Sequence, residues 1–77
     1  MKTFPKFRKY TNNKSFFRIE SELNWTEIQI VGSKKMLHHF YANQYPEKLF
    51  LQSLINFEME GIQDSNKAEF ENLLQTF

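Results

Sequence analysis

The sequence predicts one small α+β domain spanning residues 1–77: a four-stranded, mainly antiparallel sheet followed by two helices packed on one face (β-β-β-β-α-α). Two strand-like runs meet at Gly32–Ser33 in the centre of the chain. Two more precede them, separated by a polar turn. From residue 46 onwards the apolar residues are instead spaced by three and four, which is the period of a helix.

The first strand is expected over residues 4–10, at an edge of the sheet. Pro5 has no amide donor, and charged side chains occur among the residues of both faces, which is typical of an edge strand. Residues 11–14 (Thr-Asn-Asn-Lys) predict a turn, because asparagine tolerates left-handed backbone geometry.

The second strand is expected over residues 15–21, with Phe17 and Ile19 facing the core. Residues 22–25 then form a connection. We expect its Trp25 to fold over one end of the core, because an exposed indole would leave one of the largest apolar groups in water.

The central hairpin covers residues 26–42. Glu27 to Ile30 alternate polar and apolar, and Gly32 supplies the positive φ of a tight loop. A three-residue loop would pair Ile30 with Met36, Ile28 with His38 and Thr26 with Phe40. A loop of two or four residues would instead bring Leu37 and Tyr41 inward. We favour the former, with the even-numbered residues of the second strand facing the core, because the odd-numbered face carries Lys35.

A first helix is expected over residues 46–58, with a proline in its first turn. Phe50, Leu54 and Phe57 share one face, and the neighbouring leucines and Ile55 broaden that face well beyond a narrow stripe. Gly61 is expected as a cap or turn residue after the helix.

A second helix is expected over residues 66–75. Asn66 followed by Glu69 resembles a capping box, with Ser65 and Asp64 as alternative caps. The apolar residues that follow have the clearest helical spacing in the chain: Phe70, Leu73, Leu74 and Phe77.

Composition narrows the class of protein. The chain has no cysteine, which excludes disulfides and thiolate metal sites and fits a reducing compartment. No run approaches the roughly 20 apolar residues of a membrane helix. The charged start does not resemble a secretory signal, so a soluble cytoplasmic protein is expected. Thirteen aromatic residues (nine Phe, three Tyr, one Trp) predict a core of large rings.

Charge is divided along the chain. Residues 1–40 hold eight Lys/Arg and three Glu (8 − 3 = +5), whereas residues 41–77 hold two Lys and six acids (2 − 6 = −4). Such a division indicates either a basic binding surface or attraction between two parts of one domain, and we favour the second interpretation.

No catalytic, cofactor or metal motif is recognisable. His38 and His39 are adjacent on a strand and point to opposite faces, so they cannot readily share a metal. The serines lack a nucleophile context, and two glycines cannot form a phosphate-cradling loop. We therefore expect a protein that is not an enzyme and that needs neither cofactor nor metal.

Two binding functions are left. The favoured one is a non-catalytic protein-interaction or regulatory module, whose partner is another protein or a second copy, recognised through the broad apolar face of the first helix. The alternative is nucleic-acid binding by the basic aromatic hairpin of residues 4–20. Cations would contact phosphates and rings would stack on bases, and the candidate residues are Lys6, Arg8, Tyr10, Lys14, Phe16 and Arg18.

Overall fold

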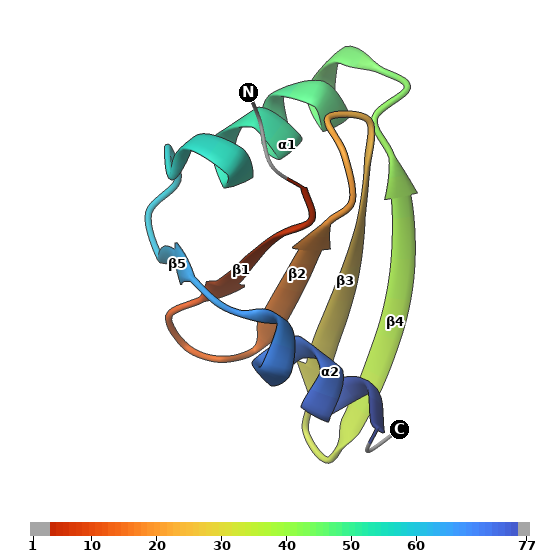
Figure 1. The fold of residues 1–77 in the computed structure, drawn as a ribbon, viewed down its shortest axis with the longest axis vertical. Coiled ribbons are helices and arrows are strands. Elements are labelled where there is room, and N and C mark those ends of the chain that lie inside the picture. Colours follow the sequence, from red (N-terminus) through yellow and green to blue (C-terminus); the bar gives the residue numbers. More distant parts are fainter. Residues whose placement is uncertain (1–3, 76–77) are drawn as a thin grey trace.

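The computed structural model describes residues 4–75. One expectation lies outside this range, namely Phe77 as the last residue of the apolar spacing in the second helix. The elements follow in the order β1 (Lys6–Tyr10), β2 (Ser15–Ile19), β3 (Asn24–Val31), β4 (Lys34–Tyr41), α1 (Tyr45–Asn56), β5 (Ile62–Asp64) and α2 (Lys67–Gln75). The α+β class with an antiparallel sheet and two helices is confirmed (Figure 1).

The sheet has five strands in the order β4-β3-β2-β1-β5, rather than the four predicted. The extra strand, β5, pairs antiparallel with β1 and places Arg8 opposite Asp64. The prediction of β1 as an edge strand was therefore wrong. Three residues are too short to show any periodicity, so β5 gave no signal in the sequence.

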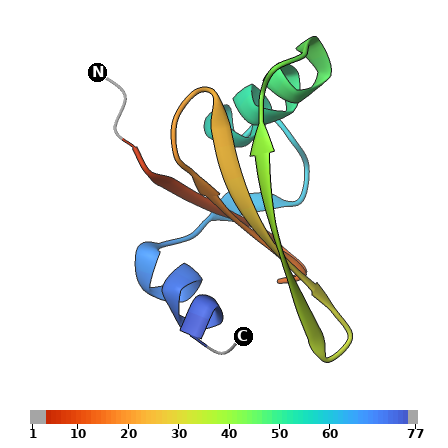
Figure 2. The same ribbon diagram turned by 90° about the vertical axis from the view of Figure 1, so that its right-hand side faces the viewer.

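The helices lie on opposite faces of the sheet, which corrects the prediction that both pack on one face (Figure 2). Leu51 and Leu54 of α1 pack with Phe17 and Ile19. On the other face, Phe70 of α2 packs with a second set of residues, which includes Phe16 and Ile28. Both faces of β2 are consequently buried, and Phe16 is core in addition to the predicted Phe17 and Ile19.

The central hairpin turns through two residues, Gly32 and Ser33, because Val31 pairs with Lys34. The three-residue loop was therefore wrong, and Ile28 lies opposite Leu37 rather than His38. Gly32 has a φ of +63°, the left-handed geometry that such a loop requires. The prediction that the even-numbered residues of this strand face the core was partly right: Phe40 and Ala42 pack on the α1 side, whereas Met36 is exposed.

Trp25 is buried within β3, opposite Phe40, and does not form a cap after an irregular connection. Helix α1 ends earlier than predicted, because Phe57 takes left-handed geometry (φ 57°) and its N–H bonds to the Ser53 carbonyl. Gly61 is a turn residue instead, with a φ of +78°. The predicted cap of α2 is confirmed: the Asn66 side chain accepts a hydrogen bond from the Glu69 N–H at 2.8 Å.

Candidate functional site

The six residues predicted to contact nucleic acid do not lie on one surface. Lys6, Arg8 and Tyr10 alternate on β1 and share the α1 face, since Arg8 lies opposite Phe17 and Tyr10 packs edge-on against the Phe17 ring at 5.3 Å. Phe16 and Arg18 share the α2 face. Lys14 is exposed in the turn that follows β1. The sheet thus separates the candidates into two groups.

Arg8 is only 6% exposed and joins β1, α1 and β5. Its Nε donates to the Leu54 carbonyl at 2.9 Å and its Nη2 to the Ile55 carbonyl at 3.0 Å. A third nitrogen, Nη1, donates to the Phe7 carbonyl and to the Asp64 carboxylate. The last carbonyls of a helix have no intrahelical donor, so the guanidinium caps α1 from outside the helix.

Burial lowers the pKa of Arg8, and the Asp64 charge acts in the opposite direction. The group keeps its charge, because an arginine does not lose its proton in proteins. Its guanidinium carbon also lies 4.0 Å from the centre of the Phe57 ring. These contacts occupy the donors that a phosphate would need.

On the α2 face the cations are also engaged with rings. Lys9 forms an ion pair with Glu69 at 2.8 Å and lies 5.7 Å above the Phe16 ring. Arg18 forms an ion pair with Glu20 and lies 5.2 Å from the centre of the Phe70 ring. Phe16 itself is 5% exposed, which leaves no open face for stacking on a base.

The remaining polar candidates are scattered. Thr26 Oγ1 and His39 Nδ1 are hydrogen-bonded at 2.9 Å on the α2 face, whereas His38 lies near the Phe40 ring on the other. Burial raises the pKa of Tyr10, and the negative charge of Glu27 raises it further. Within residues 4–75, no three His, Asp or Glu side chains are grouped to hold a metal ion.

The open feature of the sheet is its β4 edge. The strand β4 is eight residues long and, among residues 4–75, has a neighbouring strand only on the β3 side, whereas the opposite edge is the three-residue β5. Met36, Leu37 and Tyr41 are 45%, 43% and 64% exposed. No Lys, Arg, Asp or Glu occurs between Met36 and Tyr41. Long edge strands in monomers usually carry charges or bulges that prevent pairing, and this segment has no such charge.

The ladder register shows which backbone groups face the open edge. Ala42, just after β4, donates its N–H to the Leu23 carbonyl at 2.7 Å, so even-numbered positions bond inward. Successive residues in an antiparallel ladder alternate in direction. The N–H and C=O groups of Leu37 and His39 therefore point away from β3. The sequence contains one signal for this edge, the stretch from Met36 to Tyr41 without Lys, Arg, Asp or Glu.

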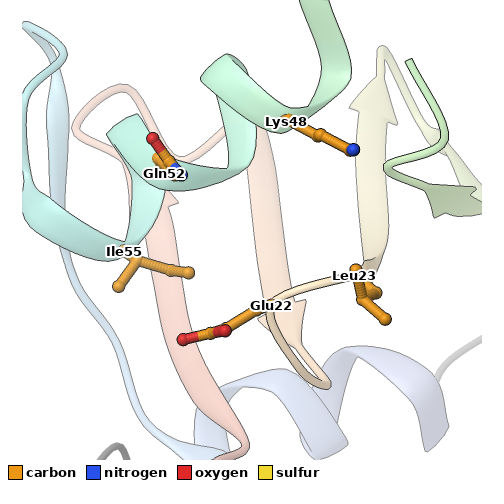
Figure 3. Close-up of a pocket in the computed structure, with 5 residues that line it drawn as sticks. All are labelled: Glu22, Leu23, Lys48, Gln52 and Ile55. Carbon is orange, nitrogen blue, oxygen red and sulfur yellow. The ribbon is translucent and has the colours of Figure 1, made fainter. Parts of the chain in front are cut away.

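A cavity of about 250 Å³ lies between α1 and the loop after β2 (Figure 3). Lys48, Gln52 and Ile55 line it from the helix, and Glu22 and Leu23 line it from the loop. In Figure 3 the Glu22 carboxylate and the Lys48 ammonium point in different directions. This arrangement brings together no nucleophile, base and oxyanion donor of a hydrolytic site.

A second, more apolar cavity of about 350 Å³ lies where the start of α1 crosses β3 and β4. It is lined by three aromatic rings, a proline and two carboxylates: Trp25, Phe40, Phe50, Pro46, Glu27 and Glu47. The Trp25 indole nitrogen is buried without a hydrogen-bond partner among the described residues. Sequence reasoning missed this cavity, because its walls come from three elements whose register was not known.

Together these features describe a small α+β fold with an open β4 edge and an aromatic cavity among its exposed features. No helix among residues 4–75 is long and apolar enough to cross a membrane. The chain matches no protein-family model, no curated protein and no solved structure.

Proposed function

We propose that this domain is a non-catalytic protein-interaction module that pairs through the open edge of β4, and that its partner is a second copy of the chain. The observation that supports this proposal is the exposed Met36–Tyr41 part of β4, which lacks Lys, Arg, Asp and Glu and has outward-facing backbone groups; the two lysines of β4, Lys34 and Lys35, lie at its start. A strand added there would satisfy those groups and cover Leu37 and Tyr41. Addition of a strand to a sheet edge is a common mode of protein recognition.

Charge favours a second copy as the added strand. Two β4 strands can pair antiparallel about a two-fold axis near His38 and His39, which gives the self-complementary contact of most homodimers. Lys34, at the start of one β4, would then lie beside the end of the other β4. Glu47 lies at that end, in the first turn of α1. Because the dimer would be symmetric, the contact between Lys34 of one copy and Glu47 of the other would occur twice.

The expected dimer is weak, because one strand pair with a few apolar side chains makes a small interface. Sedimentation velocity and light scattering from about 10 μM to 500 μM should show a reversible monomer–dimer equilibrium in this weak class. Amide exchange at Leu37 and His39 should slow as concentration rises. A strict monomer at high micromolar concentration would exclude self-association.

Leu37 and Leu49 form a matched pair of test positions. They are 43% and 46% exposed, but Leu37 lies on the β4 edge and Leu49 on α1. Leu37→Lys should abolish dimerisation, since a charge on an edge strand opposes pairing. Leu49→Lys should leave it unchanged. An effect of Leu49→Lys alone would instead locate the interface on α1, the surface that the sequence had favoured.

A further inference from the structure

We propose that the aromatic cavity beneath the start of α1 binds an alkylated ammonium ion of the choline class. The cavity is formed within one copy of the chain by β3, β4 and α1. The site is therefore complete in the monomer, and pairing through β4 is not needed to form it, although the proposed dimer would bring Lys34 of the second copy near Glu47.

Three rings form the apolar part of the site. Trp25 and Phe40 stack with centres 5.0 Å apart and planes 18° apart. Phe50 lies 5.5 Å from Trp25 at an angle of 43°. Phe40 and Phe50 are only partly buried, so both contribute open ring surface to the cavity. Trp25 is 3% exposed and lies behind them, so the negative ring faces that can attract a cation are those of Phe40 and Phe50.

Two carboxylates set the sign of the ligand. Glu27 comes from β3, two residues after Trp25 and on the same face, and Glu47 comes from the first turn of α1. Neither carboxylate is ion-paired to another residue within 4–75. The charge of Glu27 also acts on Tyr10, whose phenol pKa it helps to raise. A ligand anion would be repelled here, whereas a cation would be attracted from two sides.

The chemistry of the wall favours a quaternary ammonium over a primary ammonium. The cavity is open to solvent on one side, so a lysine-type ammonium loses water only from those of its three N–H donors that face the rings. Apart from the Glu27 and Glu47 carboxylates, the walls are rings and Pro46, which offer no acceptor. A quaternary ammonium has no N–H to satisfy and presents methyl groups to the rings, so its charge is attracted without an unpaired donor.

Titration with choline tests the proposal directly, with 3,3-dimethylbutan-1-ol as the neutral compound of the same shape. Trp25 is the only tryptophan, so its fluorescence and its indole N–H resonance report on the cavity. At constant ionic strength, choline should bind about tenfold more tightly than the neutral compound. Equal binding of the two, or no saturable change with choline, would overturn the proposal. n-Butylammonium, a primary ammonium, should bind more weakly than choline, and equal or tighter binding would refute the preference for a quaternary nitrogen.

Variants locate the effect. Glu47→Gln should weaken choline binding several-fold, because it removes one of two attractive charges without changing shape. Glu58→Gln, two residues beyond the other end of α1, should leave the affinity unchanged. An effect of equal size in both variants would show long-range charge rather than a site. Choline binding should persist in Leu37→Lys, which separates this inference from the dimer: loss of binding there would contradict a site contained in one copy.

Discussion

Replacement of Arg8 by methionine separates a structural role for this cation from a role in binding. Methionine keeps much of the apolar stem and removes the guanidinium. In the fold, that guanidinium holds the last turn of α1 to β1 through the Leu54 and Ile55 carbonyls. If the group is structural, Arg8→Met must destabilise the domain. If it were a phosphate contact, the substitution would leave stability unchanged.

The size of the destabilisation expected for Arg8→Met follows from the hydrogen bonds that the guanidinium makes. Each hydrogen bond from a charged donor contributes about 1.5–3 kcal/mol, and water will solvate part of what the substitution exposes. The Asp64 pair adds little, because that carboxylate is 76% exposed. We expect a loss of about 3 kcal/mol in the free energy of unfolding. A domain of 77 residues holds only about 4–12 kcal/mol in total, so this is a large fraction.

Urea unfolding followed by Trp25 fluorescence and far-ultraviolet circular dichroism measures the loss. Arg18→Met is the control: its partly exposed Glu20 ion pair contributes about 0–1 kcal/mol and its contact with the Phe70 ring about 0.5–1 kcal/mol, so the loss should stay below that of Arg8→Met. The free energy of unfolding of Arg8→Lys should lie between those of Arg8→Met and the wild type, since a lysine cannot reproduce the planar fork of donors. If the free energy of unfolding of Arg8→Met lay within about 0.5 kcal/mol of the wild-type value, the structural role would be refuted and Arg8 would again be a candidate phosphate contact.

Two further predictions concern charge. The hydrogen bond from Lys9, and to a smaller extent the one from Ser65, lowers the pKa of Glu69 in the folded state. The stabilisation that the Glu69 carboxylate provides is therefore present above the unfolded pKa of about 4.3 and is lost as pH falls through the lower folded pKa. The stability difference between wild type and Glu69→Gln, about 1 kcal/mol for this partly exposed pair, should therefore shrink from pH 7 to about pH 3 in urea titrations; a constant difference would contradict the prediction. For nucleic acid, fluorescence anisotropy with single- and double-stranded oligonucleotides at about 50 mM salt should show no saturable binding, because Arg8 and Phe16 are buried. Saturable binding that is weakened by Lys14→Met would support the alternative function.

The sequence was informative where one local signal dominated. The alternation of Phe17 and Ile19, the cap at Asn66 and the helical spacing after it all predicted structure correctly. It was uninformative where long-range packing decides. A strand with a helix on each face buries adjacent residues, so Phe16 beside Phe17 gave no alternation. The hairpin register depended on whether the loop had two residues or three, and the Gly32–Ser33 pair fitted both.

The candidate binding hairpin was predicted from the residues that the fold uses internally. Cations interleaved with rings indicate nucleic-acid binding only if both remain exposed. Here Arg8 lies on the Phe57 ring, Lys9 on Phe16 and Arg18 on Phe70. Two of the acidic partners, Asp64 and Glu69, come from the second half of the chain, which favours attraction between two parts of the domain as the meaning of the divided charge.

This use of charge also explains why the open surfaces lie where they do. The ion pairs and cation–ring contacts gather at β1, β5 and the two helices, so that side of the sheet is held by both faces and by its short edge strand. On the other side, β4 pairs only with β3, and α1 crosses near its end. The apolar edge and the aromatic cavity both occur on that less covered side. A surface that binds a partner must lie where internal contacts leave side chains and backbone groups available, and in this chain that condition is met along β4.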